Sequence, residues 1–78
     1  MTIPFLDQLR PGQHGRILAV AGDDALVQRL LEMGLLDGEE VEVLAFAPLG
    51  DPVEIRLGDS RLSLRRREAA RVEVAPLP

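Results

Sequence analysis

The sequence predicts a small, mainly β protein: a barrel of about five strands with one α-helix inserted after the first strand and a short helical turn at the N-terminus. Only one segment, residues 23–38, has a strong helical period. The segments on either side are short apolar runs separated by turn residues. With 78 residues, 46% hydrophobic and 28% charged, the composition is globular and predicts a single domain over residues 1–78.

The chain opens with a predicted helical turn over residues 5–9, which stops at a Pro-Gly pair. We expect the apolar side chains of this turn to dock on the core; they are Phe5, Leu6 and Leu9. Residues 13–21 predict the first strand. This strand lacks a clean alternation, which suits a strand covered on both faces or one with a bulge near Gly15.

The helix is predicted from Leu26, Leu30 and Met33, which recur at positions i, i+4 and i+7. This spacing puts the three side chains on one face, so the helix has one buried side. Either Asp23 or Asp24 can cap its start, because a carboxylate there accepts a free backbone N–H and lies at the positive end of the helix dipole.

The end of the helix is predicted at Gly34, since glycine adopts the left-handed conformation without a Cβ clash. Two leucines follow before a second turn at Asp37-Gly38. One of Leu35 and Leu36 can fold back onto the last helical turn, and the other must then point elsewhere. The exit from the helix is therefore a place where an apolar side chain can be left exposed.

Four more strands are expected after the helix, over residues 39–47, 52–57, 61–65 and 71–74. In the first of them, residues 40–43 alternate glutamate and valine, which turns the valines inward. Residues 58–60 would join two of these strands as a hairpin, and residues 66–70 form a short helical turn. Pro76 and Pro78 are expected to end the chain beyond the last strand.

Composition excludes several classes of protein. The nine basic residues are all arginine against thirteen acidic ones, and a net charge of −4 with few aromatic residues argues against a nucleic-acid-binding domain. Cysteine is absent, so there is no disulfide or thiolate metal site. The longest apolar run, residues 43–49, is far shorter than the roughly 20 residues of a membrane span, and the N-terminus does not resemble a signal peptide. We expect a cytoplasmic protein that meets a membrane only through a partner.

Neither a catalytic site nor a metal site is predicted. His14 is the only histidine and would need carboxylates to complete a metal site, so we interpret it as a surface residue. The acidic clusters at residues 23–24 and 39–42 are explained by a helix cap and a solvated strand face. The candidate hydroxyl nucleophiles have no base close to them in sequence; they are Thr2, Ser60 and Ser63. We therefore expect no catalytic residue, no cofactor and no enzymatic activity.

Five separated pieces of the chain together resemble one family. They are Leu-x-x-Leu-x-Pro-Gly at residues 6–12, Leu-Leu-Glu-Met-Gly-Leu-Leu-Asp-Gly at 30–38, Ala-Pro-Leu-Gly-Asp-Pro at 47–52, Leu-Ser-Leu-Arg-Arg at 62–66, and Glu-Ala at 68–69 leading into Val-Glu-Val at 72–74. In this order and spacing they resemble the FeoA family, from about Leu6 to Val74. The resemblance implies an SH3-like β-barrel with the helix inserted between its first two long strands.

The resemblance also implies a function. FeoA proteins are non-enzymatic accessories of bacterial Fe²⁺ uptake that contact the transporter FeoB at its cytoplasmic face, near its GTP-binding domain. The same barrel occurs as the C-terminal domain of iron-dependent repressors, so a metal-responsive regulatory module is the alternative. Because no helix-turn-helix precedes the barrel, we expect the stand-alone form. Whether contact activates, inhibits or assembles the transporter, and in which oligomeric state, is left open by the sequence.

The partner-binding surface is predicted from apolar residues that the local structure does not need. These are Leu35 and Leu36 at the helix exit, together with the loop formed by Pro48, Leu49, Gly50, Asp51 and Pro52. Leu49 either folds under this loop or stands out as an anchor. The two prolines stiffen the loop, so presenting a side chain from it costs little entropy.

The most concentrated charge is at Arg65, Arg66 and Arg67. Such arginines can simply solvate the end of a strand while their aliphatic stems lie along apolar surface. Alternatively, they form a patch for an anionic partner, or supply an arginine in trans to a bound nucleotide as GTPase-activating proteins do.

Overall fold

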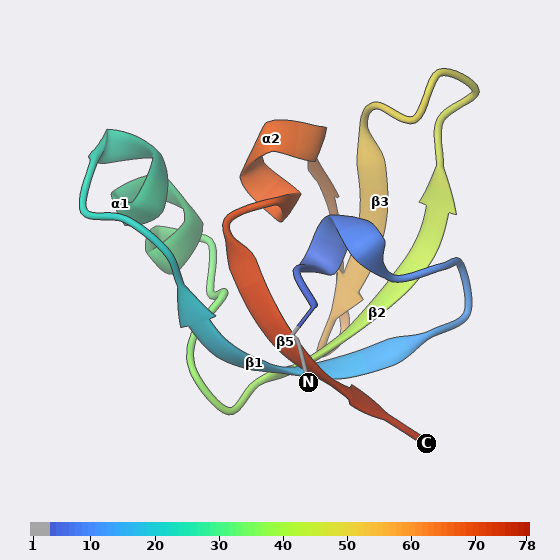
Figure 1. The fold of residues 1–78 in the computed structure, drawn as a ribbon, viewed down its shortest axis with the longest axis horizontal. Coiled ribbons are helices and arrows are strands. Elements are labelled where there is room, and N and C mark those ends of the chain that lie inside the picture. The colour runs from blue at the N-terminus through green and yellow to red at the C-terminus, as the bar shows by residue number, and fades with distance from the viewer. Residues whose placement is uncertain (1–3) are drawn as a thin grey trace.

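The fold is described by a computed structural model for residues 4–78 (Figure 1). Residues 1–3 lie outside this description, and they include Thr2, one of the three candidate hydroxyl nucleophiles. The elements in chain order are η1 (Leu6–Gln8), β1 (His14–Val20), α1 (Ala25–Glu32), β2 (Glu40–Phe46), β3 (Val53–Leu57), β4 (Ser60–Leu64), α2 (Arg66–Ala69) and β5 (Val72–Leu77). The mainly β architecture, with α1 inserted after the first strand and a helical turn before it, is confirmed.

The five strands form one antiparallel sheet in the order β4-β3-β2-β1-β5. Within residues 4–78 this sheet is open, with β4 and β5 as its edges, so strand pairing does not close the predicted barrel. Figure 1 shows α1 to one side of the sheet, α2 and η1 over its middle, and the loop between β2 and β3 on the side away from α1. Of the described helices, none has the length and apolar character that crossing a membrane requires.

The core is built from the inward faces of all five strands, α1, α2 and η1. Its buried members are Leu6, Leu9, Ile17, Leu30, Leu35, Val41, Val43, Val53, Ile55, Leu64, Ala69, Val72 and Val74. The predicted stripe of α1 is only partly buried, because Leu26 and Met33 lie at its margins while Leu30 is fully covered. Phe5, also predicted to be core, is half-buried.

Both ends of α1 have the expected geometry. Asp24 rather than Asp23 is the N-cap, and its Oδ1 accepts the Val27 N–H at 3.4 Å. At the other end Gly34 has φ +100°, and the N–H of Leu35 donates to the carbonyl of Leu30 at 3.2 Å. This is the bond pattern of a Schellman motif, which pulls the residue after the glycine back onto the helix.

The first strand differs from its prediction. Its irregularity lies between Ile17 and Ala19, where the pairing with β5 shifts register, and not at Gly15. Leu18 is the extra residue of this bulge, and its side chain is 39% exposed. Gly15 instead allows close packing, because a Cβ at that position would lie 3.1 Å from the Val74 Cβ. The strand is also not covered on both faces, since its first five residues alternate between exposed and buried.

Two boundaries in the second half of the chain also differ. The last strand runs to Leu77 instead of Val74 and passes through Pro76. This is possible because β5 is an edge strand, where a residue without an N–H need not interrupt the pairing with β1. The hairpin between β3 and β4 has a two-residue turn, not three, because Leu57 pairs with Ser60. Gly58 supplies the positive φ, +60°, that such turns require.

Candidate functional site

The loop of residues 48–52 projects from the end of the β2–β3 hairpin (Figure 1). Leu49 in this loop is 96% exposed. Of the two positions that the sequence allowed for this leucine, the structure has the outward one. The loop is closed by backbone bonds: the Gly50 N–H donates to Ala47 O at 2.7 Å, and the Ala47 N–H donates to Pro52 O at 3.0 Å. A fully exposed leucine held by a bonded turn is available as an anchor for another surface.

The same loop is tied to the start of α2. Asp51 Oδ1 accepts the backbone N–H of Arg66 at 3.1 Å. The Arg66 guanidinium lies against the loop, because a Cβ built on Gly50 would be 2.7 Å from Arg66 Nη1. The structure therefore brings the loop and the first turn of α2 together through Arg66.

Arginines 65–67 are exposed, and within residues 4–78 none of the three makes an ion pair. Four other arginines do, and their pairs are Arg16–Glu40, Arg29–Glu68, Arg56–Glu42 and Arg71–Asp24. Two carboxylates at the start of α2, Asp51 and Glu68, accept backbone N–H groups there, but within residues 4–78 neither forms an ion pair with the guanidinium groups of these three arginines.

The two leucines at the helix exit differ in burial. Leu35 is fully buried, so its side chain is not available to a partner, contrary to the expectation that it contributes a contact. Leu36 is 48% exposed. It precedes β2, whereas Leu49 follows it, and a seven-residue strand spans about 20 Å. Leu36 and Leu49 therefore flank opposite ends of β2 and do not form one apolar patch.

A small groove with both polar and apolar lining lies at the base of the loop. It has a volume of about 210 Å³ and is lined by Ala45, Phe46, Ala47, Pro52 and Glu54. The Ala47 N–H that closes the loop comes from this lining. The groove therefore offers apolar side chains next to the loop, and Glu54 is the one charged residue of its lining.

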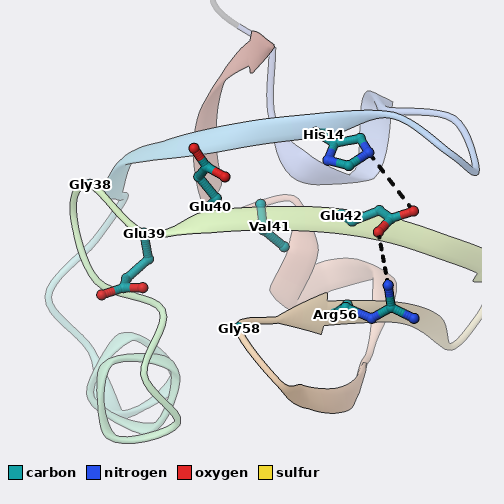
Figure 2. A pocket seen from close by; sticks show the side chains of 8 residues that line it. All are labelled: His14, Gly38, Glu39, Glu40, Val41, Glu42, Arg56 and Gly58. Atoms are coloured by element: carbon teal, nitrogen blue, oxygen red, sulfur yellow. Dashed lines mark hydrogen bonds and ion pairs between the residues drawn. The ribbon is translucent and has the colours of Figure 1, made fainter. Parts of the chain in front are cut away.

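A larger open groove of about 530 Å³ crosses the outer face of β1, β2 and β3 (Figure 2). In it His14 Nε2 is 3.9 Å from Glu42 Oε2, and Arg56 Nη1 is 3.4 Å from Glu42 Oε1. Glu39 and Glu40 lie at its side. Glu42 is a poor metal ligand because its carboxylate already pairs with the Arg56 guanidinium. In the described part of the chain, no three His, Asp or Glu side chains lie close enough together to hold a metal ion.

Sequence reasoning missed a buried carboxylate. Glu68 is 1% exposed; its Oε1 accepts the N–H of Arg65, the N-cap of α2, at 2.7 Å. Its Oε2 has no hydrogen-bond partner, but Arg29 Nη1 lies 3.2 Å away. Arg29 falls on the opposite face of the helix from Leu26, Leu30 and Met33, and no local pattern reveals that it reaches across to α2. The three-residue spacing of Arg65 and Glu68 was the one available signal, since it matches half of a capping box.

A second ion pair joins the start of α1 to the start of β5. Arg71 Nη1 and Nη2 donate to the two carboxylate oxygens of Asp24 at 3.2 and 3.1 Å. The Arg71 guanidinium lowers the pKa of Asp24 below its ordinary value of 3.8, with a smaller effect from the Val27 N–H. The resulting stabilisation is fully present above pH 3.8 and is lost as the pH falls through the lowered pKa.

The amino-acid sequence matches one protein family and a longer relative that contains the same domain. The FeoA domain family matches residues 5–76 of the chain. The chain is also 42% identical over 69 residues to a protein of Porphyromonas gingivalis, a fusion of Fe(2+) transport protein A with the Fe(2+) transporter FeoB. The match covers 88% of this chain but only 8% of the fusion protein.

Solved structures agree with this match. The FeoA protein of Chlorobium tepidum has a TM-score of 0.87 and 37% identity, over 96% of this chain and 71% of that one. The FeoA of Stenotrophomonas maltophilia, solved with zinc and described as a prokaryotic SH3 domain protein, has a TM-score of 0.81 and 34% identity, over 92% and 89%. A manganese-dependent transcriptional repressor has a TM-score of 0.88 but 16% identity, over 99% of this chain and 38% of that one, and shares the fold alone.

The predicted SH3-like fold is thus the fold of these relatives, whose names connect it with ferrous iron transport. The family match leaves out only a few residues at each end of the chain. On these grounds, the chain belongs to the FeoA domain family.

Proposed function

We propose that this protein is a cytoplasmic, non-enzymatic accessory of bacterial ferrous iron uptake that binds the cytoplasmic part of a FeoB-type transporter and modulates its transport. The observation that carries the proposal is the Porphyromonas gingivalis relative, in which the matching domain and the transporter are one polypeptide. Two proteins that work in contact can be fused without loss of function, because the linker only raises their effective concentration.

Docking, rather than catalysis, is the activity that the exposed side chains favour. Leu49 is the leading contact, because it is the most exposed large apolar residue of the described chain and its loop is already ordered. An anchor that is ordered before binding loses little conformational entropy when the partner covers it. Leu36 is the second candidate contact, at the other end of β2.

The test is the same substitution at Leu49 and Leu36, the two most exposed leucines of residues 4–78. We expect Leu49→Asp to weaken binding to the transporter's purified cytoplasmic domain about 30-fold, the loss typical of an interface anchor. Leu36→Asp should have the smaller effect, since that side chain is only 48% exposed. Affinities would be measured by calorimetry, with thermal melting of each variant as the control for folding.

Two outcomes would count against the proposal in different ways. If the wild-type chain does not bind the domain, the proposed function is wrong. If it binds and both aspartate variants bind equally well, the function stands but the contact residues are wrong.

The second candidate is a metal-responsive regulatory module, favoured by the zinc complex of the Stenotrophomonas maltophilia relative and by the fold shared with the repressor. Titration with Fe²⁺ and with Mn²⁺ separates the candidates. We expect no stoichiometric site tighter than about micromolar, because the chain has no cysteine and one histidine, whose nearest carboxylate is paired with Arg56. A tighter site that His14→Ala removes would favour the regulatory module.

A further inference from the structure

We propose that residues 48–52 and 65–67 form one docking surface, the loop–arginine surface, and that it binds an acidic segment of a partner protein through one apolar side chain and flanking carboxylates. The proposal rests on the proposed function only for the source of the segment, which we expect in the cytoplasmic part of the transporter. It adds which end of the molecule makes the contact and what chemistry the partner presents there.

The loop and the start of α2 are in direct contact. The Asp51–Arg66 bond of 3.1 Å and the Arg66 guanidinium beside Gly50 hold the loop against the start of α2. Leu49 is therefore presented from a loop whose next residue, Gly50, lies against the Arg66 guanidinium. The groove of about 210 Å³ at the base of the loop includes Ala45, Phe46 and Pro52 in its lining, against which a partner's side chain can pack.

The start of α2 carries three guanidinium groups that form no ion pair in the described chain. The arginines elsewhere that contact carboxylates are neutralised within the molecule, whereas Arg65, Arg66 and Arg67 are exposed and unpaired in the described chain. A positive surface on a protein of net charge −4 attracts an acidic segment and repels a basic one. Guanidinium groups also bind carboxylates through paired hydrogen bonds, which adds direction to this attraction.

The apolar part decides between possible occupants. A phosphate or nucleotide alone would use the arginines but would leave Leu49 and the groove exposed to water. A second copy of this chain on the same surface would bring two sets of like-charged arginines together, which costs binding energy. An acidic protein segment with a leucine-like side chain satisfies both parts of the surface.

The direct test uses two synthetic peptides, one with a central leucine flanked by glutamates and one in which lysines replace the glutamates. In NMR titrations of the ¹⁵N-labelled protein, the acidic peptide should shift the amides of Leu49, Gly50 and Arg66, and the basic peptide should not. If saturating acidic peptide leaves these amides unshifted, or if the basic peptide shifts them equally, the proposal is overturned.

Matched variants measure the part played by the arginines. R66Q/R67Q keeps the backbone N–H that Asp51 accepts and should weaken acidic-peptide binding about tenfold. The control, R10Q/R61Q, also removes two exposed arginines without ion pairs in the described chain and should change affinity less than about twofold. Equal losses from both variants would mean that net charge, not this surface, attracts the peptide, and would overturn the proposal.

The same two variants, tested against the transporter's cytoplasmic domain, separate this proposal from the proposed function. Peptide binding at the surface without any binding of the domain would refute the function and leave the surface intact. Domain binding that neither R66Q/R67Q nor added salt weakens would refute the surface and leave the function intact. We expect R66Q/R67Q to weaken domain binding about tenfold and R10Q/R61Q to leave it within about twofold.

Discussion

Leu30→Ala should lower the free energy of unfolding by about 3 kcal/mol, the middle of the range for removing a buried leucine side chain. Leu30 is fully buried in the core, and its carbonyl accepts the Leu35 N–H that closes the helix end. A chain of 78 residues has a total stability on the order of 4 to 12 kcal/mol, so this single change removes a large fraction of it. Urea denaturation followed by circular dichroism measures the loss.

The matched control is Leu36→Ala, six residues further along the chain. Leu36 is 48% exposed, so the same truncation removes less buried area and should cost less than about 1 kcal/mol. Since α1 has only eight residues, it is too short to be stable in isolation and depends on docking. Equal losses from the two variants would contradict the role of Leu30 as the residue that docks α1 on the core.

Arg29→Met should cost about 2 to 3 kcal/mol, which is large for an arginine whose side chain is 59% exposed. The reason is that its ion-pair partner, Glu68, is buried. The Glu68 carboxylate is 1% exposed, and Arg29 is the only charged group near its Oε2 among the ion pairs of the described chain. Removing the guanidinium leaves a buried carboxylate oxygen without compensation, while methionine keeps the helix propensity and the aliphatic stem.

Arg16→Met is the control for this prediction. The Arg16–Glu40 pair has a similar separation, 3.4 Å compared with 3.2 Å, but both of its side chains are more than half exposed. An exposed ion pair contributes between about 0 and 1 kcal/mol, so this variant should melt close to the wild type. If the two variants lose the same stability, burial of Glu68 does not decide the strength of the pair.

The elements of this fold that depend on neighbouring residues could be predicted well. The helix and its glycine end, the alternation of Glu and Val in β2, and the helical turns at both ends of the chain all follow from spacings of a few residues. Each is confirmed within one or two residues of the predicted bounds. The family, too, could be identified from short pieces in order, because their turns and helix ends are local features.

The candidate site could be predicted only in parts. The loop of residues 48–52 and the arginines were each singled out, but their union depends on a bond between Asp51 and Arg66, fifteen residues apart. Likewise, the sequence left Leu35 and Leu36 as alternatives, and packing decided that the first is buried. The bulge at Leu18 depends on how β1 aligns with β5, which a single strand does not reveal.

The sequence by itself therefore determined where the chain turns, which segments are strands or helix, and to which family the chain belongs. Tertiary structure decided which groups of those segments meet: the Arg66 guanidinium lies against Gly50, and Arg29 reaches the buried Glu68. The physical reason is the distance along the sequence over which each kind of interaction acts. Caps, turns and periodicity act over a few residues and are written in neighbouring positions, whereas burial and ion pairing depend on which distant segments the sheet brings together.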